Sequence, residues 1–340
     1  MGGGEFDLIE WLRKHSLVQK SDAARGLVRG IGDDAAVLRQ SPKHDTVITT
    51  DLLVEGVDFN LTGDEAADAS VVGRKAVAVS LSDVAAMGAR PRWLLLSVGV
   101  PRKLWKRVFG DSLVMSALTY ASDFGVALVG GDISSTPEHV VVDSIVVGEV
   151  GRGRAVLRSG ARPGDQIYVT GFLGGAAYTL RDTARQSWLA AHGPDGSLRE
   201  PTPHPRVEWG ALLGERRLAT ALIDLSDGLS SDLAHLCRES GVGARVVAAS
   251  LPLDPVLEQA GLTESDALRL ALDGGEDFEL LFTVSERNAS KLPNELNGVR
   301  VTRIGKVTAE RGKVRLTLIG RSRILRPGGF EHFKRDDGAR

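Results

Sequence analysis

The fold is decided by the stretch Gly73-Arg74-Lys75-Ala76-Val77-Ala78-Val79-Ser80-Leu81-Ser82-Asp83-Val84-Ala85-Ala86-Met87-Gly88-Ala89. With the residues before it, this stretch places apolar side chains at helical spacing from Asp64 to Met87, and Gly88 supplies the stop. A segment rich in β-branched residues, 47–54, precedes this helix, and an apolar segment of strand length, 93–100, follows it. Strands and helices that alternate in this way indicate α/β layering.

The same alternation extends outward in both directions. In the first half we expect a short amphipathic helix at 5–15, a helix at 103–124 and strands at 126–129 and 140–147. In the second half we expect strands at 166–170, 221–225, 244–248, 278–284 and 300–307. Helices are expected to open at the turn 171–175 and to span 205–218, 229–239, 264–272 and 285–293, with a surface loop at His192–Pro205.

The length and one change of composition predict two domains. A chain of 340 residues exceeds the roughly 250–300 residues that one hydrophobic core supports. A Gly/Arg-rich stretch, 148–154, separates the two apolar-patterned halves. We therefore predict a two-domain protein of the α+β or α/β class. Its N-terminal domain, 1–150, has a β-sheet plus helices, and its C-terminal α/β domain, 151–335, has helices packed on a mixed sheet.

The charge and the cysteine content exclude several classes of protein. Lysine and arginine number 42 against 44 aspartates and glutamates, so the net charge of -2 provides no basic field for nucleic acid. No segment approaches the roughly 20 apolar residues of a membrane helix. Cys237 is the only cysteine, which rules out an intrachain disulfide and fits a reducing cytosol. We therefore expect a cytoplasmic protein with neither nucleic acid nor membrane as its partner.

Acidic residues recur at predicted strand ends and turns, beside glycine or hydroxyl residues. One such cluster is an ordinary turn or helix cap, but six form a pattern. Like charges that converge need a counterion, and a hard cation such as Mg²⁺ takes oxygen ligands. This donor set predicts phosphoryl transfer or another ATP-dependent step. The clusters are Gly32-Asp33-Asp34, Thr49-Thr50-Asp51, Leu81-Ser82-Asp83, Gly130-Gly131-Asp132, Asp224-Leu225-Ser226-Asp227-Gly228 and Gly274-Gly275-Glu276-Asp277.

Other signatures of catalysis are absent or weak. The sequence contains no P-loop and no Gly-x-Ser-x-Gly elbow, and most of the histidines fall in loops or at polar positions. Asp123-Phe124-Gly125 resembles the metal-binding triplet of protein kinases, but it lacks the catalytic loop and is predicted to end a helix. The turn 171–175 opens a helix, where free N–H groups could hold a phosphate, although close helix packing explains its glycines equally well.

Longer motifs carry a family resemblance. In them the chain resembles the bacterial thiamine-monophosphate kinases, which belong to an ATP-binding superfamily that includes aminoimidazole ribonucleotide synthetase. The resemblance extends from about Glu5 to Phe333. Besides the stretch 73–89, its motifs are Gly32-Asp33-Asp34-Ala35-Ala36, Thr49-Thr50-Asp51, Val54-Glu55-Gly56-Val57-Asp58-Phe59, Gly130-Gly131-Asp132, Arg158-Ser159-Gly160-Ala161-Arg162-Pro163-Gly164-Asp165, Ile223-Asp224-Leu225-Ser226-Asp227-Gly228-Leu229 and Gly274-Gly275-Glu276-Asp277-Phe278-Glu279-Leu280.

The resemblance implies ATP-dependent phosphorylation of thiamine monophosphate to thiamine diphosphate, in a homodimer whose N-terminal domains pair through their sheets. It implies several Mg²⁺ ions, with ATP as co-substrate. The implied metal ligands are Asp34, Thr49, Thr50, Asp51, Asp83, Asp132, Asp224 and Asp227. The implied nucleotide contacts are Gly131, Asp132, Arg158 and Ser226. The implied substrate contacts are Glu276, Phe330 and Asp58, and the family usually has His at the position of Asp58.

The expected chemistry needs no general base, because the attacking phosphate oxygen is already anionic near neutral pH. We therefore assign no side chain as catalytic and expect metal ions to position the reacting groups. Two other functions remain open. One is an ATP-dependent synthetase of the same superfamily, similar to aminoimidazole ribonucleotide synthetase or to the hydrogenase maturation factor. The other is a non-catalytic nucleotide-binding regulator.

Overall fold

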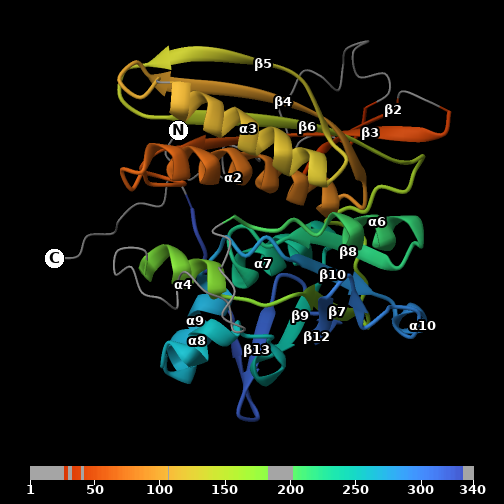
Figure 1. Cartoon of the computed structure of the whole chain (residues 1–340). Coiled ribbons are helices and arrows are strands. Elements are labelled where there is room, and N and C mark those ends of the chain that lie inside the picture. The colour runs from red at the N-terminus through yellow and green to blue at the C-terminus, as the bar shows by residue number, and fades with distance from the viewer. Residues whose placement is uncertain (1–26, 30–32, 40–41, 106, 183–201, 332–340) are drawn as a thin grey trace, which may run out of the picture.

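The computed structural model describes residues 27–29, 33–39, 42–105, 107–182 and 202–331, and it forms two units stacked on each other (Figure 1). The first unit is a six-stranded sheet with two helices, α2 (Glu65–Ala86) and α3 (Arg107–Asp123). Its neighbouring strands are antiparallel except for β4 and β5. In order across the sheet they are β1 (Leu27–Arg29), β2 (Ala36–Arg39), β3 (His44–Val54), β6 (Val141–Gly151), β4 (Arg90–Pro101) and β5 (Ala127–Thr136).

The second unit is a mixed eight-stranded sheet with short helices. Only β9 and β13 pair in parallel among its described strands. The strand order is β14 (Arg321–Ile324), β13 (Val314–Leu318), β9 (Gly243–Val247), β12 (Val299–Thr308), β7 (Gln166–Thr170), β10 (Leu280–Val284) and β8 (Ala219–Asp224), with β11 (Glu295–Leu296) paired to β12. The helices are α4 (Gly175–Asp182), α6 (Val207–Glu215), α7 (Leu229–Ser240), α8 (Pro255–Gln259), α9 (Glu264–Asp273) and α10 (Glu286–Ala289).

Helix α2 lies in the middle of the molecule, between the first sheet and the second unit (Figure 1). The Asp64 carboxylate caps its N-terminus by accepting a hydrogen bond from the Ala67 N–H at 3.2 Å. Its small residues allow close packing on two sides. A Cβ on Gly73 would lie 2.2 Å from the Leu113 carbonyl oxygen of α3, and one on Gly210 of α6 would lie 2.1 Å from the Ala85 carbonyl oxygen. Burial on most sides explains why α2 is built from Ala, Val, Ser and Gly.

The two units share one hydrophobic core cluster, which joins α2 to α6 and β8. A hydrogen bond of 2.7 Å from the Tyr120 hydroxyl of α3 to the Pro203 carbonyl oxygen adds to this contact. No helix among the residues that the structure describes is long and apolar enough to cross a membrane.

Most predicted elements are present, and several limits differ. Strand β7 has the predicted residues, and α2, α7, α9 and β12 lie within a residue or two of their predicted limits. We predicted a strand that ended at residue 129, but β5 continues to Thr136. Gly131 allows this continuation because it packs closely against β4, where a Cβ on Gly131 would lie 2.0 Å from the Leu96 carbonyl oxygen. The helix predicted at 285–293 is the short α10, and the sequence did not reveal β1, β2, α8, β11, β13 or β14.

Two predictions fall wholly or mostly on residues that the structure does not describe. The helix at 5–15 lies outside the described residues, as does most of the loop at 192–205, of which 202–205 contain no helix or strand. The boundary between domains at residue 150 stays a prediction. Residues 123–125 do end α3, and Gly125 has the positive φ of 69° that is common after a helix C-terminus.

Candidate active site

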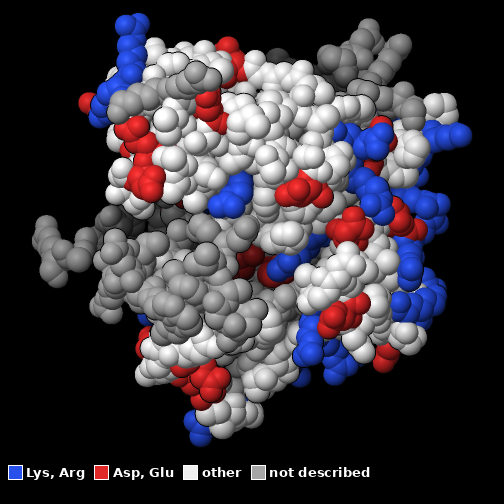
Figure 2. All heavy atoms as spheres, viewed as in Figure 1, with Lys and Arg blue, Asp and Glu red and all other residues white. Residues whose placement is uncertain are grey.

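Three carboxylates from distant parts of the chain meet at the boundary between the units. Asp34 precedes β2, Asp83 lies on α2 and Asp224 ends β8, and one oxygen from each lies within 4.8 Å of the others. Asp34 and Asp224 are buried, whereas Asp83 is partly exposed. We call these residues the carboxylate trio. Figure 2 shows acidic and basic side chains meeting in a hollow near the middle of the molecule.

The trio is electrostatically unfavourable without a cation. Burial, together with the neighbouring charge of Asp34, raises the pKa of Asp224 to about 8. Burial also raises the pKa of Asp83 well above its ordinary value, with added repulsion from Asp51 and Asp224. Three convergent carboxylates are typical ligands of a hard divalent cation, which would relieve this repulsion. The residues present therefore fit Mg²⁺.

Strand β3 directs Thr49 and Asp51 toward the trio. Successive side chains of a strand point to opposite faces, so these two residues share the face that α2 covers. The Thr49 hydroxyl donates a hydrogen bond to the Asp83 carboxylate. The Asp51 carboxylate accepts one from the Ser80 hydroxyl at 2.6 Å, and burial, followed by the charges of Asp143 and Asp34, raises the pKa of Asp51 to about 6.

Arg158 provides a cation at the trio. Its Nε and Nη2 donate hydrogen bonds to the two carboxylate oxygens of Asp34, at 2.9 and 2.7 Å. Its backbone N–H donates to the Asp33 carboxylate at 2.9 Å, and Asp33 also pairs with Arg29. The loop that begins the second unit is thereby attached to the first, and a guanidinium group lies where phosphate charge would be neutralised.

The described chain does not bring Thr50, Gly131 or Asp132 to the trio. Thr50 lies on the opposite face of β3, where its hydroxyl donates to Asp143 of β6 at 2.7 Å. Asp132 is exposed on β5, the outermost strand of its sheet beside β4. Gly131 allows β5 to pack closely against Leu96 of β4.

Two other predicted residues lie side by side: Glu276 in the loop between α9 and β10, and Ser226 in the loop between β8 and α7. The Glu276 N–H donates to the Ser226 carbonyl oxygen at 2.7 Å, and Glu276 has a positive φ of 63°. The Glu276 carboxylate forms an ion pair with Lys75 of α2. Asp58 is nearby, because its carbonyl oxygen accepts a hydrogen bond from the Lys75 Nζ at 2.7 Å, while its carboxylate accepts from the Val54 N–H at 2.7 Å.

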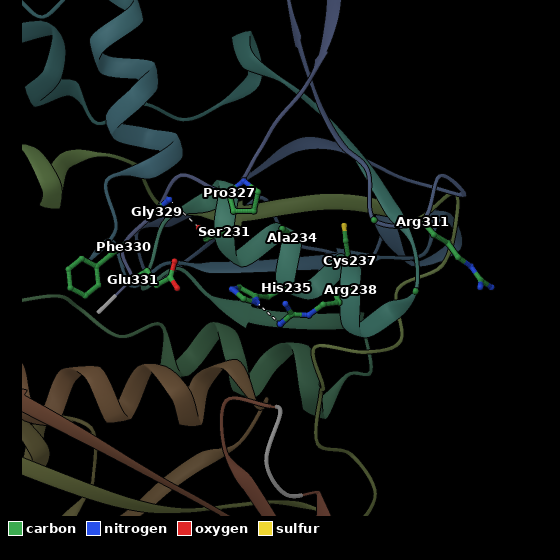
Figure 3. A pocket seen from close by; sticks show the side chains of 12 residues that line it. Ser231, Ala234, His235, Cys237, Arg238, Arg311, Pro327, Gly329, Phe330 and Glu331 are labelled. Atoms are coloured by element: carbon green, nitrogen blue, oxygen red, sulfur yellow. Dashed lines mark hydrogen bonds between the residues drawn. The ribbon is translucent and has the colours of Figure 1, made fainter. Parts of the chain in front are cut away.

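Asp227 and Phe330 lie together at the N-terminus of α7. The Phe330 N–H donates to the Asp227 carbonyl oxygen at 3.2 Å, and the preceding Gly329 N–H donates to the Ser231 hydroxyl at 3.1 Å. Phe330 is half exposed and lines one end of a cavity of about 490 Å³, and Arg311 lies at the other end (Figure 3). His235 and Arg238 extend from α7 along this cavity and bond to each other at 2.8 Å.

The turn 171–175 does not present a free phosphate site. The Gly174 N–H donates to both oxygens of the Asp277 carboxylate, at 2.9 and 3.0 Å, so Asp277 occupies the N-terminus of α4. Burial raises the pKa of Asp277 to about 8, although the hydrogen bond from Gly174 acts in the opposite direction. Close packing is also present, because a Cβ on Gly171 would lie 1.9 Å from the Glu279 carboxylate.

Some residues that support the site were not predicted. The Ser82 hydroxyl donates to the Asp224 carboxylate at 2.8 Å, and Lys75 is only 4% exposed although it is charged. Arg206 forms a buried ion pair with Glu279. A signal was available for Lys75 and Ser82, since both are polar residues inside a helix of small apolar residues and both lie in the motif 73–89.

Comparison with known proteins yields matches over nearly the whole chain. The family models "AIR synthase related protein, N-terminal domain" and "AIR synthase related protein, C-terminal domain" match residues 32–150 and 162–317. The thiamine-monophosphate kinase of Escherichia coli O157:H7 is 41% identical over 98% of this chain and 99% of its own length.

Solved structures give the same result. The structure of AaThiL complexed with AMPPCP and TMP superposes with a TM-score of 0.79 at 30% identity and covers 97% of each chain. Thiamine-monophosphate kinase from Stenotrophomonas maltophilia K279a superposes with a TM-score of 0.73 at 36% identity, over 92% of this chain and 96% of its own.

Proposed function

The chain belongs to the thiamine-monophosphate kinase family of AIR synthase related proteins, and on that premise we propose that it transfers the γ-phosphoryl group of ATP to thiamine monophosphate at the carboxylate trio. The products are thiamine diphosphate and ADP. The observation that carries this proposal is the convergence of Asp34, Asp83 and Asp224 from separate elements of both units. A relative that covers 97% of the chain was solved with AMPPCP and TMP, which supports both substrates.

The proposed step is an in-line displacement at phosphorus. An oxygen of the thiamine monophosphate phosphate forms a new bond to the γ-phosphorus of ATP, and the bond from that phosphorus to the β,γ-bridging oxygen breaks, so that ADP leaves. Because the nucleophile is already anionic, no side chain has to remove a proton. His235, which lines the same cavity as Phe330, does not suit a general base. Burial and then the Arg238 charge lower its pKa to about 4.

The proposed metal ligands are Asp34, Asp83 and Asp224, with Thr49 and Asp51 beside them. Mg²⁺ bound there would neutralise phosphate charge and align the two reacting phosphates. Ser82 and Ser80 orient the Asp224 and Asp51 carboxylates through their hydroxyls. With a cation held by Asp34, the Arg158 guanidinium group would be free to pair with ATP phosphate.

The thiamine end of the site is proposed at Glu276, Phe330 and the Asp58 turn. A carboxylate can accept hydrogen bonds from the aminopyrimidine, and an aromatic face suits the thiamine rings. Gly131, Asp132, Ser226 and Asp227 keep the metal or nucleotide roles implied by the family as predictions. Thr50, which bonds to Asp143 on the other face of β3, is not proposed to hold the ion at the trio. The homodimer and the cytoplasmic location are predictions as well.

The deciding experiment is a product analysis. Purified protein is incubated with ATP, Mg²⁺ and thiamine monophosphate, and thiamine diphosphate and ADP are quantified by chromatography. We expect the two products in equal amounts and a loss of at least about a hundredfold in kcat for Asp224→Asn. ADP with inorganic phosphate and no thiamine diphosphate would instead indicate the synthetase alternative, and nucleotide binding without turnover would indicate the regulator.

A further inference from the structure

Lys75 is a buried cation that connects the two units at the thiamine end of the site. It lies on α2, is 4% exposed, and donates hydrogen bonds through Nζ to the Glu276 carboxylate and to the Asp58 carbonyl oxygen. Glu276 belongs to the second unit, 201 positions further along the chain. A buried ammonium group is costly unless it is fully paired, so its presence inside the fold requires a specific reason.

The loop that carries Glu276 needs support from outside. Glu276 and Phe278 both have positive φ values, 63° and 47°, which are unfavourable for residues with a side chain. Two backbone hydrogen bonds hold the loop, from the Glu276 N–H to Ser226 and from the Phe278 N–H to Leu225, at 2.7 and 2.8 Å. Both partners belong to the second unit. Lys75 is the contact that fixes the Glu276 side chain relative to the first unit.

The pairing leaves part of the carboxylate available. Lys75 bonds to Oε2 of Glu276, and no hydrogen bond from a described residue reaches Oε1. The Glu276 side chain is 31% exposed. One oxygen is therefore held by the protein while the other can accept a hydrogen bond from a substrate amino group.

We propose that Lys75 is a positioning residue, which orients the Glu276 carboxylate and the Asp58 turn for recognition of the substrate's amino-bearing ring without touching the substrate. This inference rests on the proposed function. It predicts that Lys75 acts on recognition of thiamine monophosphate through Glu276 and leaves nucleotide binding at the trio nearly unchanged. A purely structural ion pair would instead affect both substrates or stability alone.

The test is a double-mutant cycle with Lys75→Met, Glu276→Gln and the double variant. Methionine keeps the length of the buried side chain and removes its charge. For Lys75→Met we expect the KM for thiamine monophosphate to rise about tenfold and the KM for ATP to change less than about twofold. In the Glu276→Gln background, Lys75→Met should raise this KM much less than in the wild type, because only its contact with the Asp58 turn is then left to lose.

The control is Lys313→Met, which removes an exposed lysine near Glu310, in the second unit outside the described site, and should leave both KM values unchanged. Equal changes in both KM values, additive effects in the cycle, or an unchanged KM for thiamine monophosphate would each overturn the role of Lys75. If Lys75→Met does not fold, as judged by its melting curve, Lys75→Gln takes its place. A wild-type enzyme that makes no thiamine diphosphate would instead contradict the proposed function itself.

Discussion

Arg158 donates hydrogen bonds to both carboxylate oxygens of Asp34, at 2.9 and 2.7 Å, so a proposed nucleotide contact is paired with a proposed metal ligand. The pair joins the first loop of the second unit to the start of β2 in the first. A divalent cation proposed at Asp34 would compete with this pairing. The guanidinium group would then be free to pair with ATP phosphate, which would couple metal binding to nucleotide binding.

Arg158→Met should make the protein more dependent on Mg²⁺ for its stability. Without the guanidinium group, the three carboxylates have no cationic partner, so we expect the metal-free protein to lose about 2 kcal/mol of unfolding free energy. Mg²⁺ should restore most of this loss. Thermal unfolding with and without Mg²⁺ measures both quantities. If Mg²⁺ stabilised the variant no more than the wild type, Arg158 would not be in competition with the cation.

The trio predicts a pH dependence of stability in the absence of metal. The pKa of Asp224 is raised to about 8 in the folded state, so the folded state holds a proton that the unfolded state has released. The free energy of unfolding should therefore fall as the pH rises from about 4 to about 8. Mg²⁺ should oppose this fall at the alkaline end. Denaturant unfolding across that range, with and without Mg²⁺, tests it, and Asp224→Asn should flatten the metal-free curve.

The sequence predicted the three carboxylates that converge here better than it predicted the residues that support them. Asp34, Asp83 and Asp224 lie at or near element ends in motifs that can be recognised directly. Ser82 and Lys75 were missed because their partners, Asp224 and Glu276, are 142 and 201 positions away, and only the packed fold brings them together.

The same reason explains the missed strands. The helix α2 and the strand β7 carry their own periodic pattern, whereas β13 is short and exists by pairing in parallel with β9. The alternation of β3 was available in the sequence, yet Thr49 and Thr50 were both assigned as metal ligands, although neighbouring residues of a strand face opposite sides.

The two threonines can be distinguished by matched substitutions. Thr49 bonds to the Asp83 carboxylate, whereas Thr50 bonds to Asp143 on the other face. We expect Thr49→Val to raise the Mg²⁺ concentration needed for half-maximal activity about tenfold and Thr50→Val to change it less than about twofold. Titrations of activity with Mg²⁺ give both values. The reverse order would mean that Thr50 binds the metal, from a second copy of the chain or after a rearrangement.

Asp277→Asn isolates a second source of pH dependence. Burial raises the pKa of Asp277 to about 8, and its carboxylate accepts the N–H groups that begin α4. An asparagine carbonyl can accept the same bonds without a charge. Relative to the wild type, the variant should gain stability as the pH rises from about 4 to about 8, by at most about 1.4 kcal/mol per pH unit. The measurements are made in saturating Mg²⁺, so that protonation of the carboxylate trio does not contribute. If the curves of unfolding free energy against pH were parallel for the wild type and the variant, Asp277 would not titrate in this pH range.

Gly329→Ala should impair binding of thiamine monophosphate through the position of Phe330. A Cβ on Gly329 would lie 2.2 Å from the Asp227 carbonyl oxygen and 2.7 Å from the Ser231 hydroxyl, so the segment that carries Phe330 must move away from α7. This segment is near the C-terminal end of the chain, and we expect its shift to lower the unfolding free energy by less than about 1 kcal/mol. The KM for thiamine monophosphate should rise about fivefold or more, and Phe330→Ala should reproduce that rise. If Gly329→Ala bound thiamine monophosphate normally while Phe330→Ala did not, the hydrogen bonds to Asp227 and Ser231 would not be what positions the ring.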